Sequence, residues 1–69
     1  MVEVFKTNVR AKRKSKLLLS VLCENFPLHK INFDLSDCDK ILRVEGKAVP
    51  PAQIISLLTA SGYQCEVLS

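Results

Sequence analysis

The chain has 69 residues, of which 48% are hydrophobic and 25% are charged, and its formal net charge is +3. A chain of this length makes one domain, expected over residues 1–69, and it buries only about 60% of its unfolded surface, which leaves little room for a deep catalytic cleft. No apolar run reaches the roughly 20 residues that span a bilayer, and the N-terminus lacks a signal-peptide pattern, so we expect a cytoplasmic protein with no membrane attachment.

The first third of the chain reads as a strand followed by a helix. Residues 2 to 7 are rich in β-branched and aromatic side chains, which favours a strand. From Lys12 to Asn25 apolar residues recur at intervals of three and four, which predicts a helix ended by Pro27. Its expected apolar stripe consists of Leu17, Leu18, Leu19, Val21 and Leu22.

The middle of the chain predicts an antiparallel hairpin. Ile31, Phe33 and Leu35 alternate with polar residues, the pattern of a strand with one buried face. A turn-forming segment follows over residues 36–39, and residues 40–45 form the second strand, with Leu42 and Val44 on one side.

The last third predicts a second helix and a final strand. Pro51 suits the first turn of a helix, and Gly62 suits the left-handed position just beyond its end. The apolar stripe of this helix consists of Ile54, Ile55, Leu57, Leu58 and Ala60. In the final strand Tyr63, Cys65 and Val67 alternate with polar residues.

The order strand, helix, strand, strand, helix, strand predicts an α+β, ferredoxin-like βαββαβ sandwich. Right-handed crossovers give a four-stranded antiparallel sheet of order 4-1-3-2 with two helices on one face. The hairpin (residues 31–46), the Pro-initiated helix (residues 51–55) and the junction at residues 60–63 resemble the heavy-metal-associated domains of copper chaperones and metal-pumping ATPases. The resemblance spans essentially the whole chain.

That family carries its metal in a Met-x-Cys-x-x-Cys loop between the first strand and the first helix, which corresponds here to residues 8–15. This chain has no cysteine, methionine or histidine there, but instead a basic run. Ammonium and guanidinium groups cannot ligate a metal, so we assign no metal residue and expect no cofactor. The resemblance predicts the fold but not the family's metal function.

The remaining candidates for chemistry are isolated residues. Cys38, in the hairpin turn, is expected at the same end of the fold as the basic loop, where a residual metal role would need a ligand from a partner chain. Cys23 and Cys65 are expected to be small core residues, and three unpaired cysteines fit a reducing compartment. His29 has no neighbours at catalytic spacing, so we expect a surface or loop-capping role and no enzyme.

The basic run is the strongest candidate for a functional surface. Arg10, Lys12, Arg13 and Lys14 precede or begin the first helix, where cations are unfavourable by about 0.3 to 1 kcal/mol each. They are either solvated charges, offset by Asp37 and Asp39 of the hairpin turn, or a docking site for an acidic protein surface or a small anion.

We do not expect nucleic acid as the main partner. The aromatic residues that stack on bases are scarce, because Phe5, Phe33 and Tyr63 are expected in the core. Charge alone would support only weak binding. The sequence therefore predicts a small non-enzymatic interaction or anion-docking module, monomeric or weakly dimeric.

Overall fold

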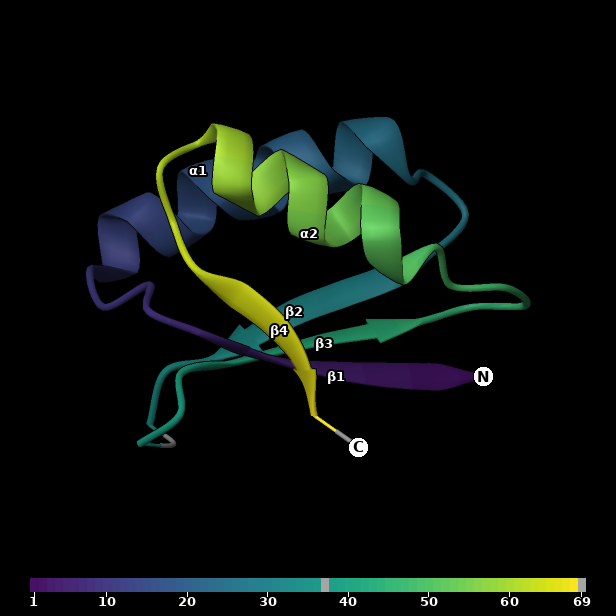
Figure 1. The fold of residues 1–69 in the computed structure, drawn as a ribbon. Coiled ribbons are helices and arrows are strands. Elements are labelled where there is room, and N and C mark those ends of the chain that lie inside the picture. Colours follow the sequence, from purple (N-terminus) through teal and green to yellow (C-terminus); the bar gives the residue numbers. More distant parts are fainter. Residues whose placement is uncertain (37, 69) are drawn as a thin grey trace.

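The computed structural model describes residues 1–36 and 38–68, and it is an α+β domain of ferredoxin-like architecture (Figure 1). The described chain has a βαββαβ order, as the sequence predicts. The elements are β1 (Val2–Thr7), α1 (Lys12–Asn25), β2 (Lys30–Asp34), β3 (Ile41–Glu45), α2 (Pro51–Ala60) and β4 (Cys65–Leu68).

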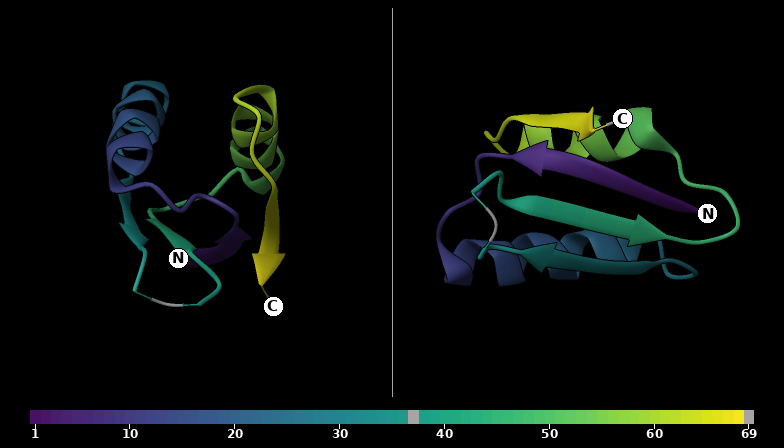
Figure 2. Two further views of the ribbon diagram at one scale, coloured as in Figure 1. Left: turned by 90° about the vertical axis from the view of Figure 1, so that its left-hand side faces the viewer. Right: turned by 90° about the horizontal axis from the view of Figure 1, so that it is seen from below.

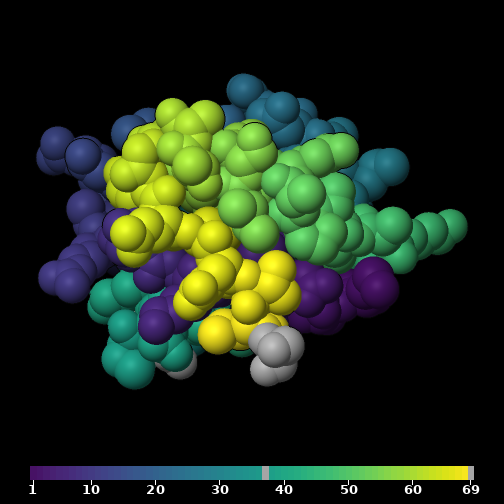
Figure 3. Space-filling model, in the orientation of Figure 1, coloured from purple at the N-terminus to yellow at the C-terminus, as the bar shows by residue number. Residues whose placement is uncertain are grey.

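The four strands form one antiparallel sheet in the order β2-β3-β1-β4. Read from the β4 edge, this is the order 4-1-3-2. Both helices lie on the same face of the sheet, with α1 over the β2 side and α2 over the β4 side (Figure 2). In the space-filling view α2 and the C-terminal segment lie side by side on one face of the molecule (Figure 3).

The core lies between the sheet and the helices. Residues at alternate positions of a strand share a face, so Phe5 of β1 and its register partner Leu42 of β3 both point at the helices. Both are fully buried, as are Leu22 of α1 and Ile54 of α2. The alternation that predicts the inward faces is therefore confirmed for β3, and the inward face of β1 is the one that carries Phe5.

Three strand boundaries differ from the prediction. Leu35 lies in the turn after β2, and Tyr63 lies before β4 begins at Cys65. Lys40 lies outside β3 because its φ of 49° is left-handed. The Thr7 side chain stabilises this conformation, since its Oγ1 donates a 2.6 Å hydrogen bond to the Lys40 carbonyl. Lys40 Nζ also donates to the Leu35 carbonyl at 3.0 Å.

The apolar stripe of α1 is only partly buried. Leu18 and Leu22 face the core, whereas Leu17 and Val21 are exposed. Cys23 is exposed as well, so the expectation that it is a core residue is wrong. The stripe is wider than the face that the sheet can cover, and residues on its flank remain in solvent.

Local signals at the helix ends are confirmed. Helix α1 ends at Asn25, two residues before Pro27, and α2 begins at Pro51. Gly62 has φ +92°, which is the left-handed conformation expected just beyond a helix end. Neither helix in the described residues has the length and apolar character needed to cross a bilayer.

Candidate docking groove between α1 and β2

A groove of about 500 Å³ runs between the N-terminal half of α1 and the outer edge of β2. We name it the α1–β2 groove. From the helix side it is lined by Arg10, Lys12, Ser15, Lys16 and Leu19. From the strand side it is lined by Asn32, Phe33 and Leu35. It therefore combines an apolar surface with three cationic side chains.

Helical spacing brings the lining residues of α1 together. Lys12 and Lys16 are four residues apart and Leu19 follows three residues later, so all three share one face of the helix. Ser15 is buried, and its Oγ donates a 2.7 Å hydrogen bond to the Lys12 carbonyl. This bond lies within α1 and satisfies the Ser15 hydroxyl at the buried side of the first turns.

The electrostatic character of the α1–β2 groove is positive. Arg10, Lys12 and Lys16 are exposed, and no acidic residue is among the side chains that line the groove. The first turn of α1 has neither an acidic residue nor a side-chain cap on Ala11, so the positive end of the helix dipole adds to these charges. An acidic ligand would complement both contributions.

The residues predicted as the docking site do not all meet in one place. Arg10 and Lys12 line the α1–β2 groove, whereas Lys14 lines a different, apolar cavity of about 320 Å³ beside Leu17 and Tyr63. Arg13 lines neither of them. The helix turns by about 100° per residue, so consecutive basic residues cannot share a face.

Sequence reasoning missed Lys16 and the strand side of the groove. The spacing of Lys12 and Lys16 was a usable signal, because residues four apart are neighbours on a helix. Phe33 was expected in the core, and it packs against the core while also lining the groove. Which strand lies beside the basic helix is a property of the topology.

Asp39 of the hairpin turn pairs with β1 and is not among the residues that line the α1–β2 groove. Asp39 Oδ1 lies 3.9 Å from Lys6 Nζ, and both side chains are about half exposed. An exposed pair of this kind contributes little to stability. Asp37, which the sequence also suggests as a counter-charge, lies outside the described residues.

Cys38 lies where the topology places it, at the end of the fold that carries the basic loop. It lines a polar cavity of about 540 Å³ together with Arg10 and the cationic residues Lys6 and Lys40. These cations oppose the binding of a metal ion by a single thiol. Among the described residues no group of three or more metal-ligating side chains comes together.

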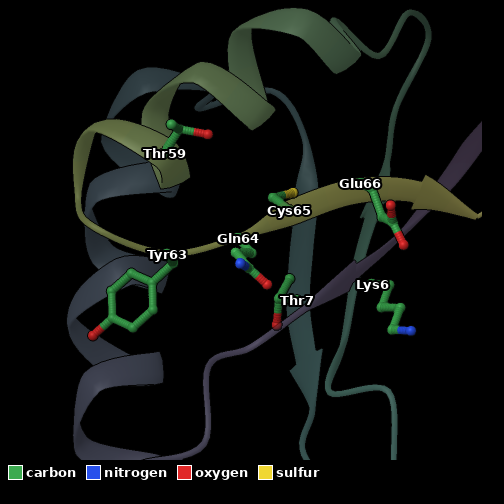
Figure 4. Close-up of a pocket in the computed structure, with 7 residues that line it drawn as sticks. All are labelled: Lys6, Thr7, Thr59, Tyr63, Gln64, Cys65 and Glu66. Atoms are coloured by element: carbon green, nitrogen blue, oxygen red, sulfur yellow. The ribbon is translucent and has the colours of Figure 1, made fainter.

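A fourth cavity, of about 450 Å³, lies between the end of β1, the end of α2 and the start of β4 (Figure 4). Its lining includes Cys65, whose pKa is raised to about 11, first by burial and second by the nearby Glu66 carboxylate. Because the nucleophilic thiolate is disfavoured there, Cys65 is a poor candidate for covalent chemistry.

Asn8 stabilises the chain beside this cavity, because its Oδ1 accepts a 2.8 Å hydrogen bond from the Gln64 backbone N–H. The bond joins the exit of β1 to the segment that enters β4. It therefore holds the basic loop at a defined place relative to the sheet.

His29 occupies the opposite end of the fold, between α1 and β2. Its Nε2 contacts the Ala48 carbonyl in the loop before α2. Its ring packs edge-on against Phe26, with 5.9 Å between the two ring centroids. This arrangement agrees with the expected loop-capping role.

Comparison of the chain with protein-family models, with curated proteins and with solved structures finds no match.

Proposed function

We propose that this chain is a non-enzymatic docking module that binds an acidic segment of another protein through the α1–β2 groove. On this proposal it is a heavy-metal-associated-like domain in which a basic loop has replaced the metal motif. The observation that carries the proposal is the composition of the groove: Arg10, Lys12 and Lys16 surround apolar Leu19 and Phe33, and no acidic side chain is among the lining residues.

The mixture of charge and apolar surface favours a protein partner over a small anion or a nucleic acid. Protein interfaces bury aromatic and aliphatic side chains within a polar rim, and the α1–β2 groove has both. A small anion would use only the cations. Nucleic acid would use several stacking aromatics, and Phe33 is the one aromatic residue among those that line the groove.

The test uses an acidic peptide probe and two matched double variants. The probe is an acetylated, amidated peptide of about seven residues, within the usual length of a strand, with valines in one half and glutamates in the other. Lys12→Gln/Lys16→Gln removes two charges that line the groove, and Arg13→Gln/Lys14→Gln removes two charges from the same helical turn that do not line it.

We expect the groove variant to weaken binding about fivefold and the control variant less than twofold. Two exposed charge contacts contribute about 1 kcal/mol in total, which corresponds to that factor. Fluorescence anisotropy measures the affinities, and circular dichroism verifies that both variants fold.

Equal weakening by the two variants would show that only the long-range field acts, and the proposal would fail. It would also fail if a single-stranded oligonucleotide bound more tightly than the peptide, with the steep salt dependence of phosphate neutralisation.

A further inference from the structure

We infer that the acidic segment binds in the α1–β2 groove as an extended strand alongside β2, so that it adds a fifth strand to the sheet. This inference rests on the proposed function and specifies its binding mode. Strand addition of this kind takes its affinity from backbone hydrogen bonds and its selectivity from alternate side chains.

The first observation is that β2 is an edge strand. Its neighbour on one side is β3, and no described strand pairs with it on the other side. An edge strand presents backbone N–H and C=O groups that can pair with another extended chain. Helix α1 lies above this edge, and the outer side of β2 borders the α1–β2 groove.

The register identifies which backbone groups point outward. The Gly46 N–H donates to the Met1 carbonyl at 2.9 Å, so Met1 and Gly46 are a hydrogen-bonded pair that extends the β1–β3 ladder. Hydrogen-bonded pairs alternate with non-hydrogen-bonded pairs in an antiparallel ladder. Val44 and Leu42 therefore direct their backbone groups toward β1.

The residues of β2 that pair with Val44 and Leu42 must then direct their backbone N–H and C=O groups away from β3. Ile31 is opposite Val44 and Phe33 is opposite Leu42, so both turn their N–H and C=O groups to the outer edge. Asn32, opposite Arg43, turns its backbone groups to β3. Ile31 and Phe33 are thus the positions at which an added strand would form hydrogen bonds.

The second observation is that the groove extends around this edge. Asn32 and Phe33 are consecutive in β2 and point to opposite faces of the sheet, yet both line the groove. An extended chain beside β2 would occupy that space. Its side chains on the helix-facing side would contact Leu19 and Leu35.

The position of α1 decides between a peptide and a second copy of the chain. Seen perpendicular to the sheet, α1 lies directly over β2 (Figure 2, right). Paired strands are about 4.8 Å apart, whereas packed helices need 8 to 10 Å between their axes. A second copy paired antiparallel through its own β2 would place its α1 on the same face and too close to the first, which favours a single extended segment as the occupant.

The third observation is charge. Arg10, Lys12 and Lys16 come from the loop before α1 and its first turns, and the start of α1 lies on the same side of the molecule as the end of β2 (Figure 1). Asp34, the acidic residue of β2, is not among the lining side chains, and its carboxylate accepts hydrogen bonds from the backbone and hydroxyl of Ser36. The segment should therefore carry its acidic residues beside the end of β2.

Residue-specific amide hydrogen exchange on the intact chain tests the binding mode, with the glutamate–valine peptide as the probe and a lysine–valine peptide as the control. At a peptide concentration of ten times Kd, we expect exchange at Ile31 and Phe33 to slow about tenfold, because it proceeds through the free fraction. Exchange at Asn32, already paired to β3, should change much less.

Each outcome separates the two proposals. Binding of the acidic peptide without protection of Ile31 and Phe33 overturns the strand mode and leaves the docking function intact. No saturable binding at about 1 mM peptide, a Kd range typical of weak complexes, overturns both. Protection of these two amides in the peptide-free protein, with a dimer in sedimentation, would show that a second copy occupies the edge and would overturn the inference.

Discussion

The imidazole ring of His29 lies directly over the backbone of Gly46, at the place where a side chain on residue 46 would begin. A Cβ added to Gly46 would lie 2.5 Å from His29 Cδ2 and 3.0 Å from Nε2. The ring cannot move freely, because Nε2 contacts the Ala48 carbonyl and Phe26 packs against its edge. The absence of a side chain at Gly46 therefore allows His29 to join α1 and β2 to the loop before α2.

Gly46→Ala should destabilise the fold by about 1 to 3 kcal/mol, the usual cost of inserting a methyl group into occupied space. This exceeds the gain of about 0.4 to 1 kcal/mol from a less flexible unfolded chain. Urea unfolding measures the change. In a His29→Ala background the same substitution should cost much less, and an equal cost in both backgrounds would show that the ring contact does not matter.

Thr7 should be more sensitive to loss of its hydroxyl than to loss of its methyl group. Thr7→Val leaves the Lys40 carbonyl and the Val9 N–H without the Thr7 oxygen, which now lies 2.6 and 3.3 Å from them, and we expect a loss of about 2 kcal/mol. Thr7→Ser keeps the hydroxyl and should lose only about 1 kcal/mol. Thermal or urea unfolding measures both changes. A Thr7→Val variant more stable than Thr7→Ser would contradict this account.

The three cysteines should react with thiol reagents at different rates. Cys23 and Cys38 are exposed, whereas Cys65 is partly buried and has a pKa of about 11. Because the thiolate is the reactive form, Cys65 at pH 8 should react at least about tenfold more slowly than Cys38, and its rate should rise about tenfold per pH unit below its pKa.

Mass spectrometry of the labelled protein resolves the three sites, and denaturation in urea should bring the three rates together. Equally fast labelling of Cys38 and Cys65 in the folded protein would be incompatible with the position of Cys65 in β4.

A capping residue at position 11 should stabilise α1, and only an acidic cap should weaken docking. Ala11 makes no side-chain cap, so Ala11→Ser and Ala11→Asp should each stabilise the protein by about 1 kcal/mol. Only Ala11→Asp also places a carboxylate beside Arg10 and Lys12, so it alone should weaken the acidic peptide. If both variants lower the affinity for the acidic peptide equally, the charge of the groove does not determine peptide binding.

Local patterns in the sequence were sufficient to predict the order of the elements. The spacing of apolar residues in α1, the alternation around Leu42 and the proline at the start of α2 depend only on neighbouring residues and on backbone geometry. Gly62 likewise adopts its left-handed conformation for a local reason. The basic character of the segment between β1 and α1 was equally visible.

Boundaries and exposure were decided by contacts between distant parts of the chain. Lys40 leaves the strand conformation because the side chain of Thr7, 33 residues earlier, binds its carbonyl. Leu17 and Val21 belong to the same apolar stripe as Leu18 and Leu22 but remain exposed, since the sheet covers only part of that stripe. No local pattern distinguishes these residues.

The candidate site likewise combines features that the local sequence determines with features that the tertiary structure determines. Its charges could be read from the sequence, but residues adjacent in the chain diverge around the helix, so Lys14 faces away from the groove that Lys12 lines. The apolar side of the groove comes from β2, whose position at the edge follows from the pairing of all four strands. The sequence by itself determined the elements and the charge of the basic loop, and only the packing of α1 over β2 decided which of those charges meet an open strand edge.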